Sequence, residues 1–268
     1  MPESETTPAA DTAPRPGDSY VQSFARGLAV IRSFDARAPQ QTLTEVAQRT
    51  GLTRAGARRI LLTLEGLGYV RSQGRQFCLT PRILDLGFAY LSSLPLWNLA
   101  EPVMQELVEE LKESCSAAVL DGADIVYVLR VPTHKIMSIN LGIGSRLPAA
   151  CTSMGRMLLA ELDAGAVDEL LRRHPLVART ARTITDAATL HAELARVRAQ
   201  GWCLVDQELE EGLVSLAVPI RDRAGRAIAA MNVSGQAART PAATMVAQFL
   251  PRLQAAAAQI SQFLQAKA

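Results

Sequence analysis

The residues whose types and spacing most clearly define a chemistry in this chain are arginines. Arg54, Arg58 and Arg59 fall within the segment LTEVAQRTGLTRAGARRI, residues 43–60. At 3.6 residues per turn they share the outer side of a helix with Ala55, because the apolar residues of the stretch cluster on the other side. A guanidinium donates two parallel hydrogen bonds to phosphate or to guanine, so this pattern indicates DNA binding.

The residues around these arginines have the order of a helix-turn-helix. Thr42 followed by Glu45 is typical of a capped helix start, and Gly51 stands where the turn needs a positive φ. Thr53 is expected to cap the second helix, over about 54–67. The N-terminal outer face of such a helix enters the major groove in DNA-binding proteins.

The next stretch, YVRSQGRQFCLTP, predicts two short strands joined by a turn. These strands would form a wing beside the second helix. The wing would carry Arg71, Gln73 and Arg75 towards the DNA backbone or the minor groove. Arg26 and Arg32, on a helix predicted to begin near Val21, would reach flanking phosphates.

Positive charge is concentrated around these elements. Residues 20–93 hold ten arginines and four acidic residues, whereas residues 94–268 hold 17 basic and 18 acidic side chains. A small cationic module joined to a larger, nearly neutral part suggests a polyanion-binding module with a second function attached. The alternative is a helix-turn-helix that serves only packing, with its arginines in solvent.

A second group of chemically useful residues lies in the C-terminal half. Strands are predicted over 213–221 and 226–234, and alternation places Ser215, Asn232 and Ser234 on one face among small or apolar residues. These three side chains would line one cavity.

A predicted helix over 153–161 adds polar groups to the same region. The loop before it offers Thr152, Ser153 and Met154, with free backbone N–H groups that suit a carboxylate. Asp206, at the end of another predicted strand, would accept hydrogen bonds from a ligand hydroxyl or from water.

Two predicted domains must position these groups, and their pattern is α+β. We expect a disordered tail over 1–19, a winged helix-turn-helix over 20–81, and an antiparallel sheet with flanking helices over 95–268. The strands of this sheet include one predicted at 136–141. Residues 82–94 predict an apolar linker helix, which either forms a dimer contact or packs within its own chain.

Other classes of protein fit the sequence less well. The 268 residues contain no apolar stretch long enough to span a membrane and no secretory signal, so we expect a cytoplasmic protein. The four cysteines lie far apart, which favours free, buried thiols. No phosphate-binding, nucleophile-elbow or metal-ligand motif is found, so no catalytic residue, cofactor or metal is expected. The acidic residues of 206–211 are expected to form a solvated loop.

The chain resembles the IclR family of bacterial transcription regulators over about residues 20–268. The resemblance rests on SFARGLAVIRSFD, GYVRSQGRQFCLTPRILDLG, LGIGSRLPAACTSMGRMLLA and GWCLVDQELEEGLVSLAVPI. RLPAACTSMGRMLLA most resembles the Pca- and Pob-type regulators, which control catabolism of aromatic acids by the β-ketoadipate route. The family implies a winged helix-turn-helix followed by a GAF-like effector-binding domain.

The resemblance also implies partners and a pocket. Members bind double-stranded operator DNA as dimers or tetramers, and a small carboxylate effector changes operator affinity or contact with RNA polymerase. The pocket would use the loop from Gly144 to Met154, Asp206, Ser215 and the segment Asn232–Ser234. The cation facing an aromatic acid would be Arg130, His134 or Arg146.

Two alternatives remain open at this point. A DNA-tethered enzyme would act on the bound metabolite, whereas a purely architectural DNA-binding protein would need no polar-lined pocket. Turnover of a bound metabolite by the purified protein would distinguish the first alternative from a regulator.

Overall fold

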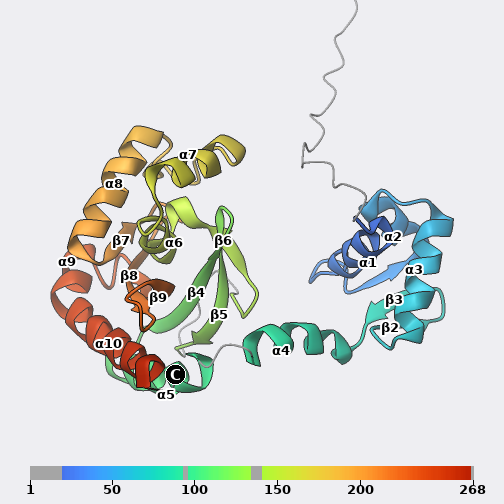
Figure 1. Ribbon diagram of the computed structural model, residues 1–268, viewed down its shortest axis with the longest axis horizontal. Helices are drawn as coiled ribbons and strands as arrows, with labels where there is room; N and C mark the ends of the chain where they lie inside the picture. The colour runs from blue at the N-terminus through green and yellow to red at the C-terminus, as the bar shows by residue number, and fades with distance from the viewer. Residues whose placement is uncertain (1–19, 93–95, 134–140, 267–268) are drawn as a thin grey trace, which may run out of the picture. The chain divides into compact units, whose positions relative to one another are not determined.

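The computed structural model describes residues 20–92, 96–133 and 141–266. The chain divides into two compact units, Met1–Tyr90 and Leu91–Ala268 (Figure 1). The division falls inside a helix, α4 (Leu84–Ser92), in the stretch predicted as a linker. The predicted tail, residues 1–19, lies outside the described residues, as does nearly all of the strand predicted at 136–141.

The first unit is a winged helix-turn-helix. Its elements are α1 (Gln22–Arg32), β1 (Gln40–Thr42), α2 (Leu43–Thr50), α3 (Arg54–Gly66), β2 (Val70–Gln73), β3 (Gln76–Leu79), a 3-10 turn (Pro81–Ile83) and α4. The three strands form an antiparallel sheet in the order β1-β3-β2. The sequence predicted the hairpin but not β1. This strand of three residues pairs with β3 and adds a third strand to the wing sheet.

Local signals explain why these helices begin and end where they do. Thr42 Oγ1 accepts the N–H of Glu45, and the Glu45 carboxylate accepts the N–H of Thr42, so the predicted capping box is present. Gly51 ends α2 with a φ of 66°. Thr53 caps α3 by accepting the N–H of Gly56. The turn between the two helices is therefore fixed by short-range contacts.

The core of this unit is small and lies between the three helices and the wing. Its buried side chains are Val30, Val46, Ala47, Ala57, Leu61, Leu64 and Val70. Of the apolar residues that predicted the first helix, Ile31 and Phe34 pack against this core, whereas Phe24 and Leu28 are exposed. Part of the apolar surface of α1 is therefore left uncovered within the described chain.

The second unit is a six-stranded antiparallel sheet covered by helices on both faces. The strand order is β6-β5-β4-β9-β8-β7. The strands are β4 (Ser114–Asp121), β5 (Asp124–Val131), β6 (Arg146–Pro148), β7 (Cys203–Asp206), β8 (Leu213–Arg221) and β9 (Ala227–Gln236). The helices are α5 (Leu96–Leu111), α6 (Ser153–Leu159), α7 (Ala164–Arg173), α8 (Ala187–Gln200), α9 (Ala242–Thr244) and α10 (Leu250–Ala266), with a 3-10 turn at Ala149–Cys151 and a π turn at Met245–Phe249. The predicted α+β class is confirmed.

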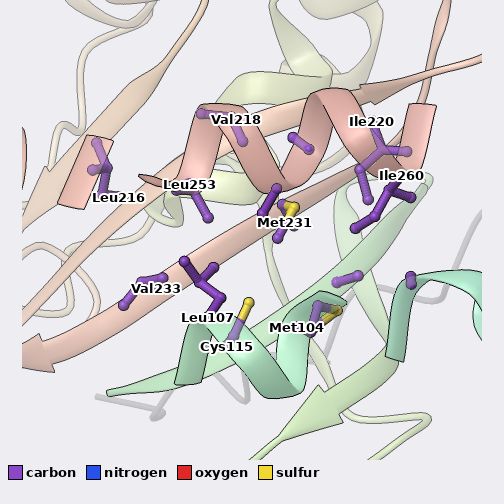
Figure 2. Packing of buried hydrophobic residues seen from close by; sticks show 14 of the residues in the cluster. Met104, Leu107, Cys115, Leu216, Val218, Ile220, Met231, Val233, Leu253 and Ile260 are labelled. Carbon is purple, nitrogen blue, oxygen red and sulfur yellow. The ribbon is translucent and has the colours of Figure 1, made fainter. Parts of the chain in front are cut away.

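One face of the sheet packs against α5 and α10. Met104 and Leu107 of α5 lie on the side of β4 and β5, whereas Leu253 belongs to α10, which packs on β8 and β9 (Figure 2). Alternation assigns Val214, Leu216, Val218 and Ile220 to this face, together with Ala229, Met231 and Val233 of the neighbouring strand. This core is almost entirely aliphatic.

The opposite face packs against α6 and α8. Ala217 and Ala230 of the sheet contact Met154, Met157 and Leu158 of α6 in this second core. Ser215, Asn232 and Ser234 belong to this face, as alternation predicted. The two faces of the same strands thus differ, because Ser215, Asn232 and Ser234 add polar side chains to the face covered by α6.

The 3-10 turn Ala149–Cys151 packs directly on α6. A Cβ atom placed on Gly155 would lie 2.2 Å from the carbonyl oxygen of Ala149 and 2.5 Å from Thr152 Oγ1. Only glycine permits this approach, because both neighbours are fixed in the backbone and cap of the same segment. The turn and the helix therefore form one tightly packed wall on this side of the sheet.

Candidate DNA interface and ligand cavity

The outer face of α3 presents arginines to solvent. Arg54, Ala55, Arg58 and Arg59 are exposed, whereas Ala57 on the same helix is fully buried. Within the described residues, the three arginines form no side-chain hydrogen bond or ion pair. Unpaired guanidinium groups on the N-terminal half of a recognition helix are available for phosphate and base edges.

The wing adds a second exposed cationic edge. Arg71, Gln73 and Arg75 are all exposed on the β2–β3 hairpin. The guanidinium of Arg71 already makes one hydrogen bond, because its Nε donates to Cys78 Sγ of the neighbouring strand at 3.2 Å. Arg26 on α1 is exposed as well. The predicted DNA-contacting residues therefore all lie on the surface of the first unit.

A candidate ligand-binding cavity, here called the ligand cavity, lies between the polar face of the sheet and the wall formed by the 3-10 turn and α6. Seven of the side chains predicted for the effector pocket or its cation line this cavity: Arg130, Thr152, Ser153, Met154, Ser215, Asn232 and Ser234. Leu147 and Cys151 also line it and fall within the predicted loop Gly144–Met154, whereas the sequence analysis missed five others, Tyr127, Leu141, Val205, Leu209 and Leu213. Most of the missed residues are apolar, so their types alone did not distinguish them from ordinary core residues.

Strand register brings the polar residues together. Asn232 of β9 is paired with Ser116 of β4, and Ser116 is paired in turn with Arg130 of β5. Ser234 of β9 is likewise paired with Ser215 of β8. These two rows cross the sheet side by side, and Arg130 Nη1 donates to Ser116 Oγ at 3.2 Å.

A β-bulge decides which side of the sheet Arg130 occupies. Ala117 is paired with Leu129 and Ala118 with Tyr127, so Val128 falls outside the pairing with β4. Strict alternation would place Tyr127 and Arg130 on opposite faces, but the extra residue brings both into the cavity. Burial raises the pKa of Tyr127 to about 12, against the opposing charge of Arg130, so its phenol is neutral.

Two buried polar atoms in the ligand cavity lack partners. Ser153 Oγ and Asn232 Oδ1 have no hydrogen-bond partner among the described residues, although Asn232 Nδ2 donates to Ser234 Oγ at 2.9 Å. Leaving a buried polar group unpaired costs about 1–3 kcal/mol. Both atoms are therefore positioned to bind a molecule that supplies the missing hydrogen bonds.

Three described residues predicted for the pocket, Gly144, Arg146 and Asp206, are not part of this lining. Gly144 has a φ of 85° in the turn that pairs with the edge of β5, where its N–H donates to the carbonyl of Tyr127. Arg146 forms ion pairs with Asp121 and Asp124 at 2.6 and 3.2 Å. His134 lies outside the described residues.

Asp206 is the third, and its position corrects the expectation from its place at a strand end. Val205, not Asp206, is paired with Ser215, so Val205 faces the cavity. Asp206 points the other way and binds Arg182 at 2.5 Å. Neighbouring residues of a strand point to opposite faces, so a shift of one residue decides whether Val205 or Asp206 faces the cavity.

The acidic loop after β7 is not simply solvated, as the sequence had suggested. Glu208 is 8% exposed and accepts two hydrogen bonds, at 2.6 and 2.5 Å, from Arg156 of α6, which is 1% exposed. Arg156 Nε also donates to the carbonyl of Ala150, and Glu208 accepts the N–H of Ile184. This ion pair joins α6, the 3-10 turn and two loops behind the ligand cavity.

The described residues contain no group of three or more His, Cys, Asp and Glu side chains placed to hold a metal ion. Nor does any helix in this part of the chain combine the length and apolar character that a membrane span requires.

Comparison with known families identifies both units. Residues 23–74 match the IclR helix-turn-helix domain, and residues 88–262 match the model described as bacterial transcriptional regulator IclR C-terminal. The chain belongs to the IclR family. It is a DNA-binding transcriptional regulator, as the resemblance had implied.

Relatives of this IclR-family regulator support the Pca/Pob-type subfamily. The Pca regulon regulatory protein of Pseudomonas putida is 48% identical over 88% of this chain and 82% of its own length. Among solved structures, a putative transcriptional regulator from Rhodococcus sp. RHA1 is 50% identical, with a TM-score of 0.84 over 93% of this chain and 100% of its own.

A further solved structure contains a bound ligand. An IclR homolog from Microbacterium hydrocarbonoxydans, complexed with 4-hydroxybenzoate, is 26% identical to this regulator. The two superpose with a TM-score of 0.81 over 91% of this chain and 100% of the homolog.

Replacing Arg58 with alanine should weaken DNA binding and leave the second unit unchanged. Loss of one arginine–guanine contact costs about 1–3 kcal/mol, so we expect roughly a 5- to 150-fold rise in Kd. Fluorescence anisotropy with a DNA site enriched in vitro by the wild-type protein measures this change. Arg223→Ala, which removes an exposed arginine in the second unit, is the control. Equal Kd values for Arg58→Ala and wild type would refute the assignment of α3.

Replacing Arg156 with methionine should destabilise the second unit by about 3–5 kcal/mol, because Glu208 would stay buried without its partner. Urea-induced unfolding followed by circular dichroism measures the loss. The double variant Arg156→Met/Glu208→Leu should recover most of the stability, since it leaves no charge unpaired. A double variant as unstable as the single one would show that the ion pair is not the cause.

Proposed function

We propose that the ligand cavity binds a hydroxylated aromatic acid and that this binding regulates operator recognition by the first unit. The observation that carries the proposal is the pair of unpartnered buried atoms, Ser153 Oγ and Asn232 Oδ1, in a cavity that also contains Arg130. The 4-hydroxybenzoate complex of the Microbacterium homolog supports the same class of ligand.

Each polar group in the cavity suits one part of such a ligand. Asn232 Oδ1 is an acceptor only, so it needs a donor such as a ring hydroxyl. Arg130 supplies positive charge for a carboxylate, and Ser153 can donate to the same carboxylate or to the ring hydroxyl. Tyr127, Met154 and Leu209 provide apolar contact for the ring. An acid without a hydroxyl would leave Asn232 Oδ1 unpaired.

Binding must widen the cavity. Its volume is 30 Å³, whereas an engineered cavity that binds benzene holds about 150 Å³. Because the surrounding core is closely packed, a ring can enter only if the wall of the cavity moves. Movement of α6 or of the loop that holds Leu209 would change the surface of the second unit. Ligand binding would then favour one conformation of the protein over another.

We also propose that the regulator works as a homodimer or homotetramer. Leu84, Leu86, Phe88 and Tyr90 of α4 are exposed in the single chain, which is an unfavourable arrangement for a short helix in water. A second copy would cover them and would place two α3 helices at two half-sites. Ligand binding would then change operator affinity or contact with RNA polymerase, in the cytoplasm.

A thermal-shift assay tests the ligand class by titrating the protein with 4-hydroxybenzoate, protocatechuate, β-ketoadipate and pyruvate. We expect a saturable rise in Tm with a hydroxybenzoate, because at 100 times the Kd a ligand adds about 2.7 kcal/mol to the stability of the folded state. Asn232→Leu should reduce the rise, whereas Arg58→Ala should retain it. A rise that Asn232→Leu leaves unchanged would place the ligand elsewhere, and consumption of the added acid would favour the DNA-tethered enzyme.

Charged substitutions on α4 should break the assembly. Light scattering after gel filtration should give the wild type at two or four times the chain mass of 28.8 kDa. Phe88→Glu should lower the mass, because burying an unpaired carboxylate in an interface is costly. Asp85→Asn, on the same helix, is the control. A wild type that elutes at the mass of one chain would contradict the proposal.

A further inference from the structure

A second cavity, here called the apolar cavity, lies on the other side of the 3-10 turn Ala149–Cys151. Its volume is 180 Å³, six times that of the ligand cavity. α6 and α7 contribute Leu159, Val167, Leu170 and Leu171 to its lining. An engineered cavity of about 150 Å³ lined by similar side chains binds benzene, so this one has room for a six-membered ring without any movement of its walls.

The polar character of the apolar cavity differs from that of the ligand cavity. Within the described chain, the buried side-chain atoms that lack a hydrogen-bond partner all belong to residues outside the lining of the apolar cavity. A ligand hydroxyl would therefore meet no unsatisfied buried side-chain group there and would lose its hydrogen bonds to water. The cavity should favour a molecule whose body is apolar.

The edge of the apolar cavity is cationic. Arg179 lines it, is exposed, and forms no side-chain hydrogen bond or ion pair within the described residues. The only carboxylate of the lining, Asp124, is already paired with Arg146. Burial raises the pKa of the Cys151 thiol, which also lines the cavity, and the positive charge of Arg179 opposes this effect.

We propose that the apolar cavity is a second ligand site, which takes a monocarboxylic acid with an apolar, ring-sized body. The body would fill the space between α6 and α7, and the carboxylate would pair with Arg179 at the opening. His174, which is exposed and also lines the cavity, adds an imidazole to the lining. This site does not depend on the function proposed for the ligand cavity.

The two cavities share part of one wall. Cys151 lines both of them. Ala150 and Ile184 line the apolar cavity, and their backbone groups bind Arg156 and Glu208, the ion pair behind the ligand cavity. A molecule in the apolar cavity would therefore contact the same wall that must move when the ligand cavity fills.

The test uses 4-fluorobenzoate, which has an apolar ring and no hydroxyl, and follows its binding to the full-length protein by fluorine NMR and calorimetry. We expect saturable binding that persists in Ser234→Leu, a variant that fills the ligand cavity. Arg179→Gln should weaken the binding about fivefold, as expected for a partly exposed ion pair of about 1 kcal/mol. Arg223→Gln, at a remote exposed arginine, should leave the Kd unchanged.

Filling the cavity provides a second, independent variant. Val167→Phe should abolish the binding of 4-fluorobenzoate while circular dichroism shows a folded protein. If Val167→Phe does not fold, Arg179→Gln still tests the site, because Arg179 is exposed and its replacement should not affect folding. No binding to the wild type would overturn the proposal. So would binding that is lost in Ser234→Leu and unaffected by Arg179→Gln. The binding of 4-hydroxybenzoate should instead be lost in Ser234→Leu and unaffected by Arg179→Gln. The two proposed sites can therefore be refuted independently of each other.

Discussion

The arrangement of the second unit depends on the buried ion pair between Arg156 and Glu208. It ties α6 to the loop after β7, and the additional contacts of Arg156 with Ala150 and of Glu208 with Ile184 fix the walls of both cavities. Two desolvated charges are stable only when paired and fully hydrogen-bonded. The geometry behind the ligand cavity is therefore set by electrostatics, although most of the surrounding core is aliphatic.

The two functional surfaces of the regulator are built in different ways. The candidate DNA interface comes from a continuous segment, in which caps at Thr42 and Thr53 and a glycine turn orient one helix. The ligand cavity is assembled from five strands, one helix and a 3-10 turn that are spread over residues 124–236. Its shape consequently depends on register and packing, which offers many points at which a ligand can perturb the unit.

This difference explains how much the sequence could predict. The helix-turn-helix and its exposed arginines follow from local signals, and alternation correctly placed Ser215, Asn232 and Ser234 on one face. The sequence did not predict that Asp206 would face away, because the pairing of β7 with β8 sets that side. Nor did it distinguish buried Glu208 from its exposed neighbour Glu211, since the partner of Glu208 lies 52 residues away.

The bulge at Val128 has a consequence for how such a regulator can diverge. One extra residue in β5 puts the positive charge of Arg130 in the ligand cavity instead of in the aliphatic core. A substitution at a lining residue can alter ligand preference and leave the pairing of strands intact. A deletion near Val128 would exchange the two faces of the strand end and bury a charge in hydrocarbon. New effector preferences should therefore arise in this fold by changes of residue type, while the length of β5 is held constant.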